Sequence, residues 1–114
     1  MSDVSDSNLE KRKFRIDRYV VPKASRDEFL VGVRKMAVFL KTLDGCVRTL
    51  AVEAPLSLET ISVITIAEWD SAEAIRNAFP KVRAMHQESG NNPGANLKRL
   101  GVTAEQAEYL PITD

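Results

Sequence analysis

The chain has 114 residues, of which 44% are hydrophobic and 28% charged, and its 16 basic and 16 acidic side chains give a net charge of zero. This length predicts one domain, and the composition is that of a globular protein rather than a disordered or membrane-spanning one. Zero net charge argues against nucleic acid and anionic membranes as partners, and one cysteine with one histidine is too few ligands for a zinc site.

The N-terminal segment, residues 1–11, is expected to be a disordered tail because it is rich in Ser and Asp and shows no hydrophobic period. It lacks the apolar centre of a secretion signal, and no apolar run approaches the roughly 20 residues that span a membrane. The sequence therefore predicts a cytoplasmic protein whose single domain occupies residues 12–114.

The first predicted elements are a strand and a helix. Apolar and polar residues alternate over residues 13–21, which indicates a half-buried strand. Ser25 and Glu28 then have the spacing of a capping box, in which each side chain satisfies a free backbone amide. Apolar residues follow at helical spacing and predict an amphipathic helix over residues 26–42.

Two further strands are predicted over residues 46–53 and 61–69, where β-branched residues are dense. In the second of these strands, both alternating sets of side chains contain large apolar residues. Both faces of that strand are therefore expected to be covered by other parts of the protein.

The rest of the chain predicts two helices and a last strand. Ser71 precedes a helical apolar pattern that runs to His86, and Pro80 inside it is expected to kink or split the helix because proline lacks an amide hydrogen. A short helix over residues 93–100 and a strand over residues 104–110 complete the domain.

The order β-α-β-β-α-(α)-β is that of an α+β, ferredoxin-like domain, in which a four-stranded antiparallel sheet carries its helices on one face. The other face of such a sheet stays uncovered, although strand 61–69 is apolar on both sides. The chain is therefore expected to form a homodimer through the open face of the sheet.

Several of these segments together resemble the antibiotic biosynthesis monooxygenase family. The resemblance spans about residues 13–110 and rests on Val21-Pro22, on residues 26–29 (RDEF), on the turn at residues 43–47 (LDGCV) and on residues 67–74 (AEWDSAEA). Its most specific part is the tryptophan that ends a strand and is followed by an acidic residue, a serine and a helix. The family implies a ferredoxin-like domain that pairs into a dimeric α/β barrel, with a pocket between sheet and helices in each subunit.

The resemblance also implies an activity. Family members include cofactor-free oxygenases of polyketide anthrones and quinols, and a deprotonated electron-rich phenol can pass an electron to O₂ without help from a metal or a flavin. We therefore expect a monooxygenase with no cofactor that acts on a small aromatic or quinol compound. A non-catalytic dimeric module that binds a ligand or serves assembly, and a haem-degrading monooxygenase as in a related branch, are the alternatives.

Six residues are the candidates for the site. Trp69 lies where polyketide-oxidising relatives have a pocket tryptophan, Thr65 where they carry an asparagine, and Ile75 where they carry a tyrosine. We expect Trp69, Ile75 and Phe79 to contact the substrate, His86 to accept a proton, and Thr65 and Tyr19 to position polar groups.

Several polar and aromatic residues have a structural interpretation as well. Trp69 fits a core or dimer-interface residue, and His86 fits either a partly buried histidine with satisfied nitrogens or a haem ligand. Arg15, Asp17 and Tyr19 share one face of the first strand. They either surround a polar substrate or form a solvated or interface-facing row with cross-strand ion pairs, which is the commoner arrangement.

Overall fold

The structure is a computed structural model that describes residues 9–113. Most of the predicted tail, residues 1–8, lies outside the described residues, and residues 9–11 at its end are helical. None of the helices in the described part of the chain combines the length and the hydropathy that crossing a membrane requires.

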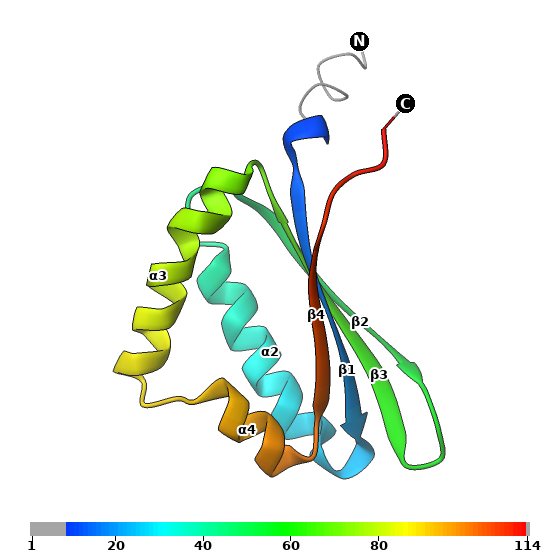
Figure 1. Ribbon diagram of the computed structural model, residues 1–114. Helices are drawn as coiled ribbons and strands as arrows, with labels where there is room; N and C mark the ends of the chain where they lie inside the picture. The colour runs from blue at the N-terminus through cyan, green and yellow to red at the C-terminus, as the bar shows by residue number, and fades with distance from the viewer. Residues whose placement is uncertain (1–8, 114) are drawn as a thin grey trace.

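The elements follow the predicted order. They are β1 (Lys13–Pro22), a 3₁₀ turn η1 (Lys23–Ser25), α2 (Arg26–Leu40), β2 (Cys46–Pro55), β3 (Thr60–Trp69), α3 (Ala72–Glu88), α4 (Pro93–Leu100) and β4 (Thr103–Tyr109). The four strands form one antiparallel sheet in the order β2-β3-β1-β4. Figure 1 shows α2, α3 and α4 on one face of this sheet, with the other face uncovered. The predicted α+β, ferredoxin-like fold is confirmed.

Two helices begin with the side-chain caps that their sequences favour. The Ser71 hydroxyl accepts the amide hydrogen of the residue three positions on, at 3.1 Å, and the Asn92 side chain does the same at 3.0 Å. Each cap satisfies one of the amides that the first turn of a helix leaves free. These caps fix where α3 and α4 begin.

The predicted capping box at the start of α2 is wrong. Ser25 has helical backbone angles, φ −99° and ψ −1°, rather than the extended conformation from which a hydroxyl reaches the next turn. Its hydroxyl donates instead to the carbonyl of Leu100 at 2.8 Å, and Glu28 pairs with Arg99. Both side chains therefore join α2 to α4.

Pro80 does not split α3, which runs without a break from Ala72 to Glu88. Pro80 and Arg76, four residues earlier, are both exposed. The Arg76 carbonyl that loses its amide partner can therefore bind water, which reduces the cost of a proline inside a helix.

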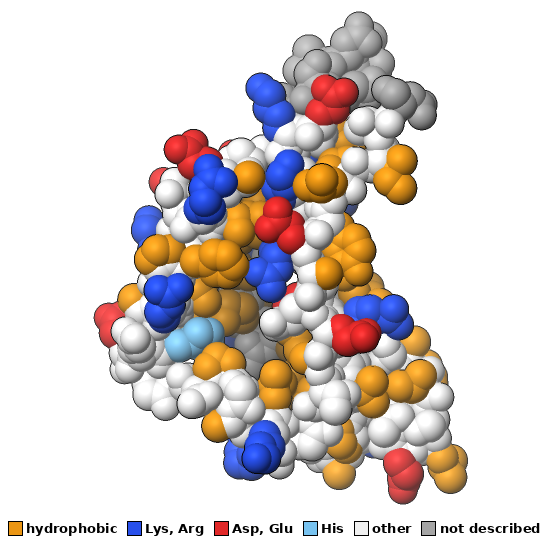
Figure 2. Space-filling view, in the orientation of Figure 1, with side chains coloured by type: hydrophobic (Ala, Val, Ile, Leu, Met, Phe, Trp, Pro, Cys, Tyr) orange, Lys and Arg blue, Asp and Glu red, His pale blue; other side chains and the backbone are white. Residues whose placement is uncertain are grey.

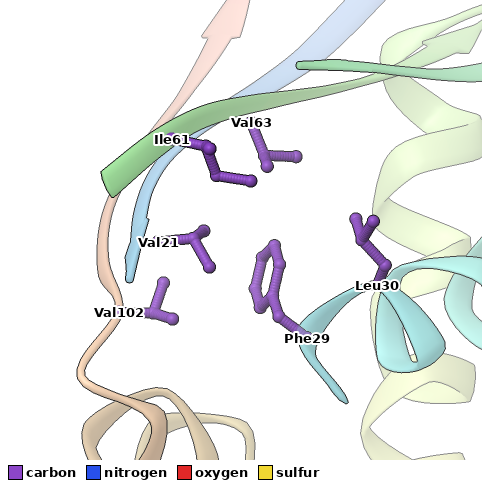
Figure 3. Close-up of a cluster of buried hydrophobic side chains, with 6 residues drawn as sticks. All are labelled: Val21, Phe29, Leu30, Ile61, Val63 and Val102. Carbon is purple, nitrogen blue, oxygen red and sulfur yellow. The ribbon is translucent and has the colours of Figure 1, made fainter. Parts of the chain in front are cut away.

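Two clusters of buried side chains hold the helices against the sheet. The first cluster joins β1, β3, α2 and the residue before β4, and consists of Val21, Phe29, Leu30, Ile61, Val63 and Val102. Figure 3 shows these side chains converging around the Phe29 ring. The second cluster joins the end of β3 to the start of α3 and consists of Trp69, Ala74, Ile75 and Ala78. The helices and the sheet also enclose a cavity, which residues of both clusters line.

The uncovered face of the sheet is rich in apolar side chains. Strand alternation and register place on it Phe14, Ile16 and Val20 of β1, Leu50 and Val52 of β2, and Ile64 and Ile66 of β3, together with the charged Arg18 of β1, which lies between Ile64 of β3 and Glu105 of β4. Leu50 and Val52 are about half exposed. At one end of this face, the carboxylate of Glu68 is buried between Arg12 and Arg48.

Candidate functional site

A cavity of about 720 Å³ lies between the sheet and the three helices. Figure 2 shows it as a hollow bordered by α3, α4 and β4, with hydrophobic side chains inside and the pale blue histidine at its margin. Small-molecule sites in proteins have volumes of roughly 300–1,000 Å³. The cavity is therefore large enough for a small organic ligand.

The floor of the cavity is polar because β1 turns its polar side chains towards the helices. Arg15, Asp17 and Tyr19 point towards the helices, on the same side of the strand as the fully buried Val21. The side chains of Arg15 and Asp17 are only 26% and 18% exposed. The commoner interpretation of these residues, a solvated or interface-facing row, is therefore wrong: the polar face of β1 is its inner face.

Asp17 lies at the centre of this polar floor. The sheet register places it between Thr65 of β3 and Gln106 of β4. The Tyr19 hydroxyl donates to Asp17 Oδ2 at 3.3 Å, and a guanidinium nitrogen of Arg15 lies 3.7 Å from Asp17 Oδ1. The five side chains form one polar group on three adjacent strands.

The ionisation of these residues is perturbed by their position. Burial raises the pKa of Asp17, although the positive charge of Arg15 and hydrogen bonds from Tyr19 and Gln106 oppose that rise. Burial and the nearby charge of Asp17 also raise the pKa of Tyr19. Tyr19 is therefore a neutral hydrogen-bond donor at physiological pH, and the Asp17 carboxylate holds a proton more readily than an exposed one.

Two polar atoms of this group have no hydrogen-bond partner among the described residues. They are Asp17 Oδ1 and Arg15 Nε, and both are shielded from solvent. Buried polar atoms without partners are rare in folded proteins, since each one costs free energy. The floor therefore retains one free acceptor and one free donor.

The residues predicted to contact a substrate form an apolar wall of the cavity. Trp69 and Ile75 are 3% and 5% exposed, so they belong to the core as well as to the lining of the cavity. Phe79 is about half exposed, and the centre of its ring lies 5.8 Å from the guanidinium carbon of Arg15. Both interpretations of Trp69, core residue and pocket wall, describe its position.

His86 lines the cavity from the last turns of α3 and is half-buried. Its Nδ1 lies 3.2 Å from the side-chain amide of Asn91. The structure thus brings His86 into one cavity with the other five predicted residues: Tyr19, Thr65, Trp69, Ile75 and Phe79.

Sequence reasoning missed Gln106, and it placed Arg15 and Asp17 only among the alternatives. The signal for Gln106 is its register opposite Asp17, which becomes visible only once β4 is paired with β1. Among the described residues, no three His, Cys, Asp or Glu side chains come together as metal ligands.

No protein-family model and no curated protein matches the sequence. Solved structures match it. SnoaB, a cofactor-independent oxygenase from Streptomyces nogalater, is 23% identical, with a TM-score of 0.65 over 91% of this chain and 96% of that chain. The monooxygenase from ActVA-Orf6 of Streptomyces coelicolor, in complex with nanaomycin D, is 15% identical, with a TM-score of 0.58 over 98% of this chain and 96% of that one.

A third similar structure is a dimeric ferredoxin-like protein from an uncultured marine organism. It is 14% identical, with a TM-score of 0.62, and the match covers 91% of this chain and 99% of that chain. At these identities the comparisons establish the fold. The chain has the fold of antibiotic biosynthesis monooxygenases, and the resemblance drawn from its sequence is confirmed at that level.

Proposed function

We propose that this protein belongs to the antibiotic biosynthesis monooxygenase family and oxidises a small aromatic or quinol compound with O₂, without a metal or organic cofactor. The observation that carries the proposal is the cavity of about 720 Å³, which joins an apolar, aromatic wall to a single polar floor. The fold shared with the cofactor-independent oxygenase SnoaB supports it.

The two kinds of lining have separate roles in this proposal. Trp69, Ile75 and Phe79 hold the rings of the substrate, because aromatic and aliphatic side chains gain most from contact with flat apolar ligands. Thr65 and Tyr19 position the oxygen atoms of the substrate on the floor. The apolar side chains of the wall limit the access of water to reactive intermediates.

The chemistry begins with a proton transfer. Removing the proton of a phenol or enol gives an electron-rich anion that passes an electron to O₂. For a methylene group between two aromatic rings, the net reaction is CH₂ + O₂ → C=O + H₂O, so one oxygen atom enters the product and the other leaves as water. Two side chains of the cavity can accept the proton, His86 and Asp17.

We also propose that a second copy of this chain covers the open face of the sheet. The apolar side chains on that face, which include the half-exposed Leu50 and Val52, have no cover within the described chain, and exposed apolar patches often mark a protein interface. The dimeric ferredoxin-like protein, matched over 99% of its length, supports this arrangement.

Oxygen uptake tests the proposed activity. The full chain is incubated in air with a panel of anthrones and hydroquinones, with and without EDTA, and dissolved oxygen and products are followed. We expect turnover of at least one compound that EDTA does not change. In Phe79→Ala, kcat/KM should fall at least about tenfold, because the substrate ring loses its contact with the Phe79 ring. Val38→Ala, on an exposed part of α2, should leave kcat/KM unchanged.

The same panel separates the enzyme from a binding module. A compound that raises the melting temperature of the protein but consumes no oxygen would replace the proposed activity with ligand binding alone. Absence of both turnover and stabilisation across the panel would overturn the proposed substrate class.

A further inference from the structure

The centre of the cavity floor carries a carboxylate that no part of the described chain fully satisfies. Asp17 lies on β1, one of the two central strands, with Thr65 and Gln106 directly beside it on the neighbouring strands. Around this row, the cavity wall is mainly apolar. A ligand with polar oxygen atoms therefore meets its main polar contacts here.

Asp17 has unused capacity to accept hydrogen bonds. An ionised carboxylate accepts about four, whereas Asp17 Oδ2 receives a long one from Tyr19, at 3.3 Å, and Gln106 is the other neutral donor beside the carboxylate. Oδ1 is buried without a hydrogen bond, and so is Nε of the adjacent Arg15. A small reorientation of the carboxylate would present an acceptor to a hydroxyl group in the cavity.

We propose that Asp17, rather than His86, is the proton acceptor of the cavity, and that Arg15 stabilises the substrate anion that results. The inference rests on the proposed function, because it assigns a role within that same site. In this step the O–H bond of a bound phenol or enol breaks and its electron pair remains on the substrate oxygen. The proton forms a new O–H bond with the Asp17 carboxylate.

The electrostatics of the floor favour this transfer. The negative charge passes from Asp17 to an adjacent substrate oxygen, so the total charge of the cavity does not change. Before and after the transfer, the negative charge lies close to the Arg15 guanidinium. Burial raises the pKa of Asp17, which brings its affinity for a proton closer to that of a phenol.

His86 is less suited to this step. Its Nδ1 already lies within hydrogen-bond distance of the Asn91 side chain, in the segment between α3 and α4. It lies on a helix, whereas Asp17 lies in the sheet beside the other polar groups that can bind the substrate oxygens.

A binding experiment tests the contact without requiring turnover. The affinities of a naphthol and of the corresponding naphthyl methyl ether are measured by calorimetry at neutral pH for the wild-type protein and for Asp17→Asn. Wild-type protein should prefer the naphthol at least about tenfold, because only the naphthol donates a charge-assisted hydrogen bond to Asp17. In Asp17→Asn the preference should shrink to about twofold, and in the exposed control Asp27→Asn it should persist. Equal preferences in wild type and Asp17→Asn would overturn the inference.

The kinetic experiment uses whichever compound of the panel is oxidised. Asp17→Asn should lower kcat about 100-fold or more, with a smaller change in KM, and His86→Gln should lower it less than tenfold. Retention of more than about a tenth of the wild-type kcat in Asp17→Asn would remove Asp17 from the role while leaving the proposed function intact. If the wild-type protein prefers the naphthol but takes up no oxygen, the proposed monooxygenase activity is overturned, whereas the proposed contact between Asp17 and a substrate hydroxyl stands.

The pH profile gives a further readout. Wild-type kcat should rise with pH as Asp17 loses its proton, above the ordinary aspartate value of 3.8, and Asp17→Asn should lack this rise. The ionisable groups around Asp17 are Arg15 and Tyr19 on β1, Glu108 opposite Arg15 on β4, and Glu28, Lys41, His86 and Arg99 of the helices that line the cavity. In His86→Gln, which keeps Asp17, the acidic limb of the profile should persist. If His86→Gln abolishes that limb and Asp17→Asn keeps it, the assignment is wrong.

Discussion

The two faces of the sheet differ, and β1 reverses the usual pattern. Most of its polar side chains face the helices, and most of its apolar side chains face outward. On this strand, the side chains that point to the helices are Arg15, Asp17 and Tyr19, whereas Phe14 and Ile16 point to the uncovered face. The neighbouring β3 shows no such reversal, since it presents Ile61 and Val63 to the core and Ile64 and Ile66 to the open side.

The difference matches the two interactions proposed above, a ligand on the inner face and a second copy of the chain on the outer face. The inner face is packed at both ends and hollow in the middle, so it can bury polar side chains around a ligand. The outer face is mainly apolar along β2, β3 and β1, with Arg18 of β1 and Glu105 of β4 opposite each other on it, and it has no cover within the described chain. An apolar surface of that kind is what a permanent partner requires.

The strongest test of the packed part of the inner face is Phe29→Ala. The Phe29 ring is 7% exposed, lies at the centre of the first buried cluster and contacts the Tyr19 ring edge-on, with 5.0 Å between their centres. Its removal should lower the free energy of unfolding by about 3–5 kcal/mol in urea titrations.

The matched control is Phe79→Ala, from the hollow part of the same face. Because the Phe79 side chain is 47% exposed, its removal should cost only about 1 kcal/mol. Equal losses for the two phenylalanines would contradict the division of the inner face into a packed end and a hollow centre.

The outer face is tested by Ile64→Lys, which places a second positive charge beside Arg18 at the middle of the uncovered sheet. A buried lysine without a partner should weaken self-association at least about 100-fold, equivalent to about 2.8 kcal/mol, and should leave the monomer folded. Sedimentation across a concentration series measures this, with Val38→Lys on the exposed side of α2 as the control. Unaltered dimer formation by Ile64→Lys, or a wild-type protein that stays monomeric, would contradict an interface at this face.

The strands and helices could be predicted from the sequence almost to the residue, because hydrophobic period and turn residues act locally. The strand expected over residues 61–69 is β3, Thr60–Trp69. What could not be predicted is which face of β1 turns inward: alternation shows that Arg15, Asp17 and Tyr19 share a face but not what that face meets.

The capping box predicted at the start of α2 was wrong for a related reason. Ser25 and Glu28 fit a local capping motif, but their partners, Leu100 and Arg99, lie more than 70 residues away in the sequence. Gln106 likewise gained its place in the site only through the pairing of β4 with β1. Contacts between distant parts of the chain decided both outcomes.

A smaller effect on the inner side is expected from Ser25→Ala. Its hydroxyl connects the start of α2 to the end of α4, which closes one end of the cavity. Loss of this partly buried hydrogen bond should lower the free energy of unfolding by about 1 kcal/mol. Ser89→Ala removes an exposed bond to the carbonyl of His86 and should have almost no effect. A loss at Ser25 no larger than that at Ser89 would show that α4 is held by other contacts.

The smallest effect concerns how the polar floor responds to pH. Because burial raises the pKa of Asp17, the folded state holds the Asp17 proton more tightly than the unfolded state does. This contribution to stability is complete below the ordinary value of 3.8 and is lost as pH rises through the folded-state pKa. Arg15, Tyr19 and Gln106 oppose the shift, so the change should be modest.

Asp17→Asn lacks the titrating proton, and its stability relative to the wild-type protein should therefore increase between about pH 3.5 and pH 7. Urea unfolding of both proteins across this range measures the difference. A difference that stays constant, or that changes in favour of the wild-type protein as pH rises, would mean that the carboxylate is as well solvated on the inner face as in the unfolded chain, and the contrast between the two faces of β1 would lose its energetic basis.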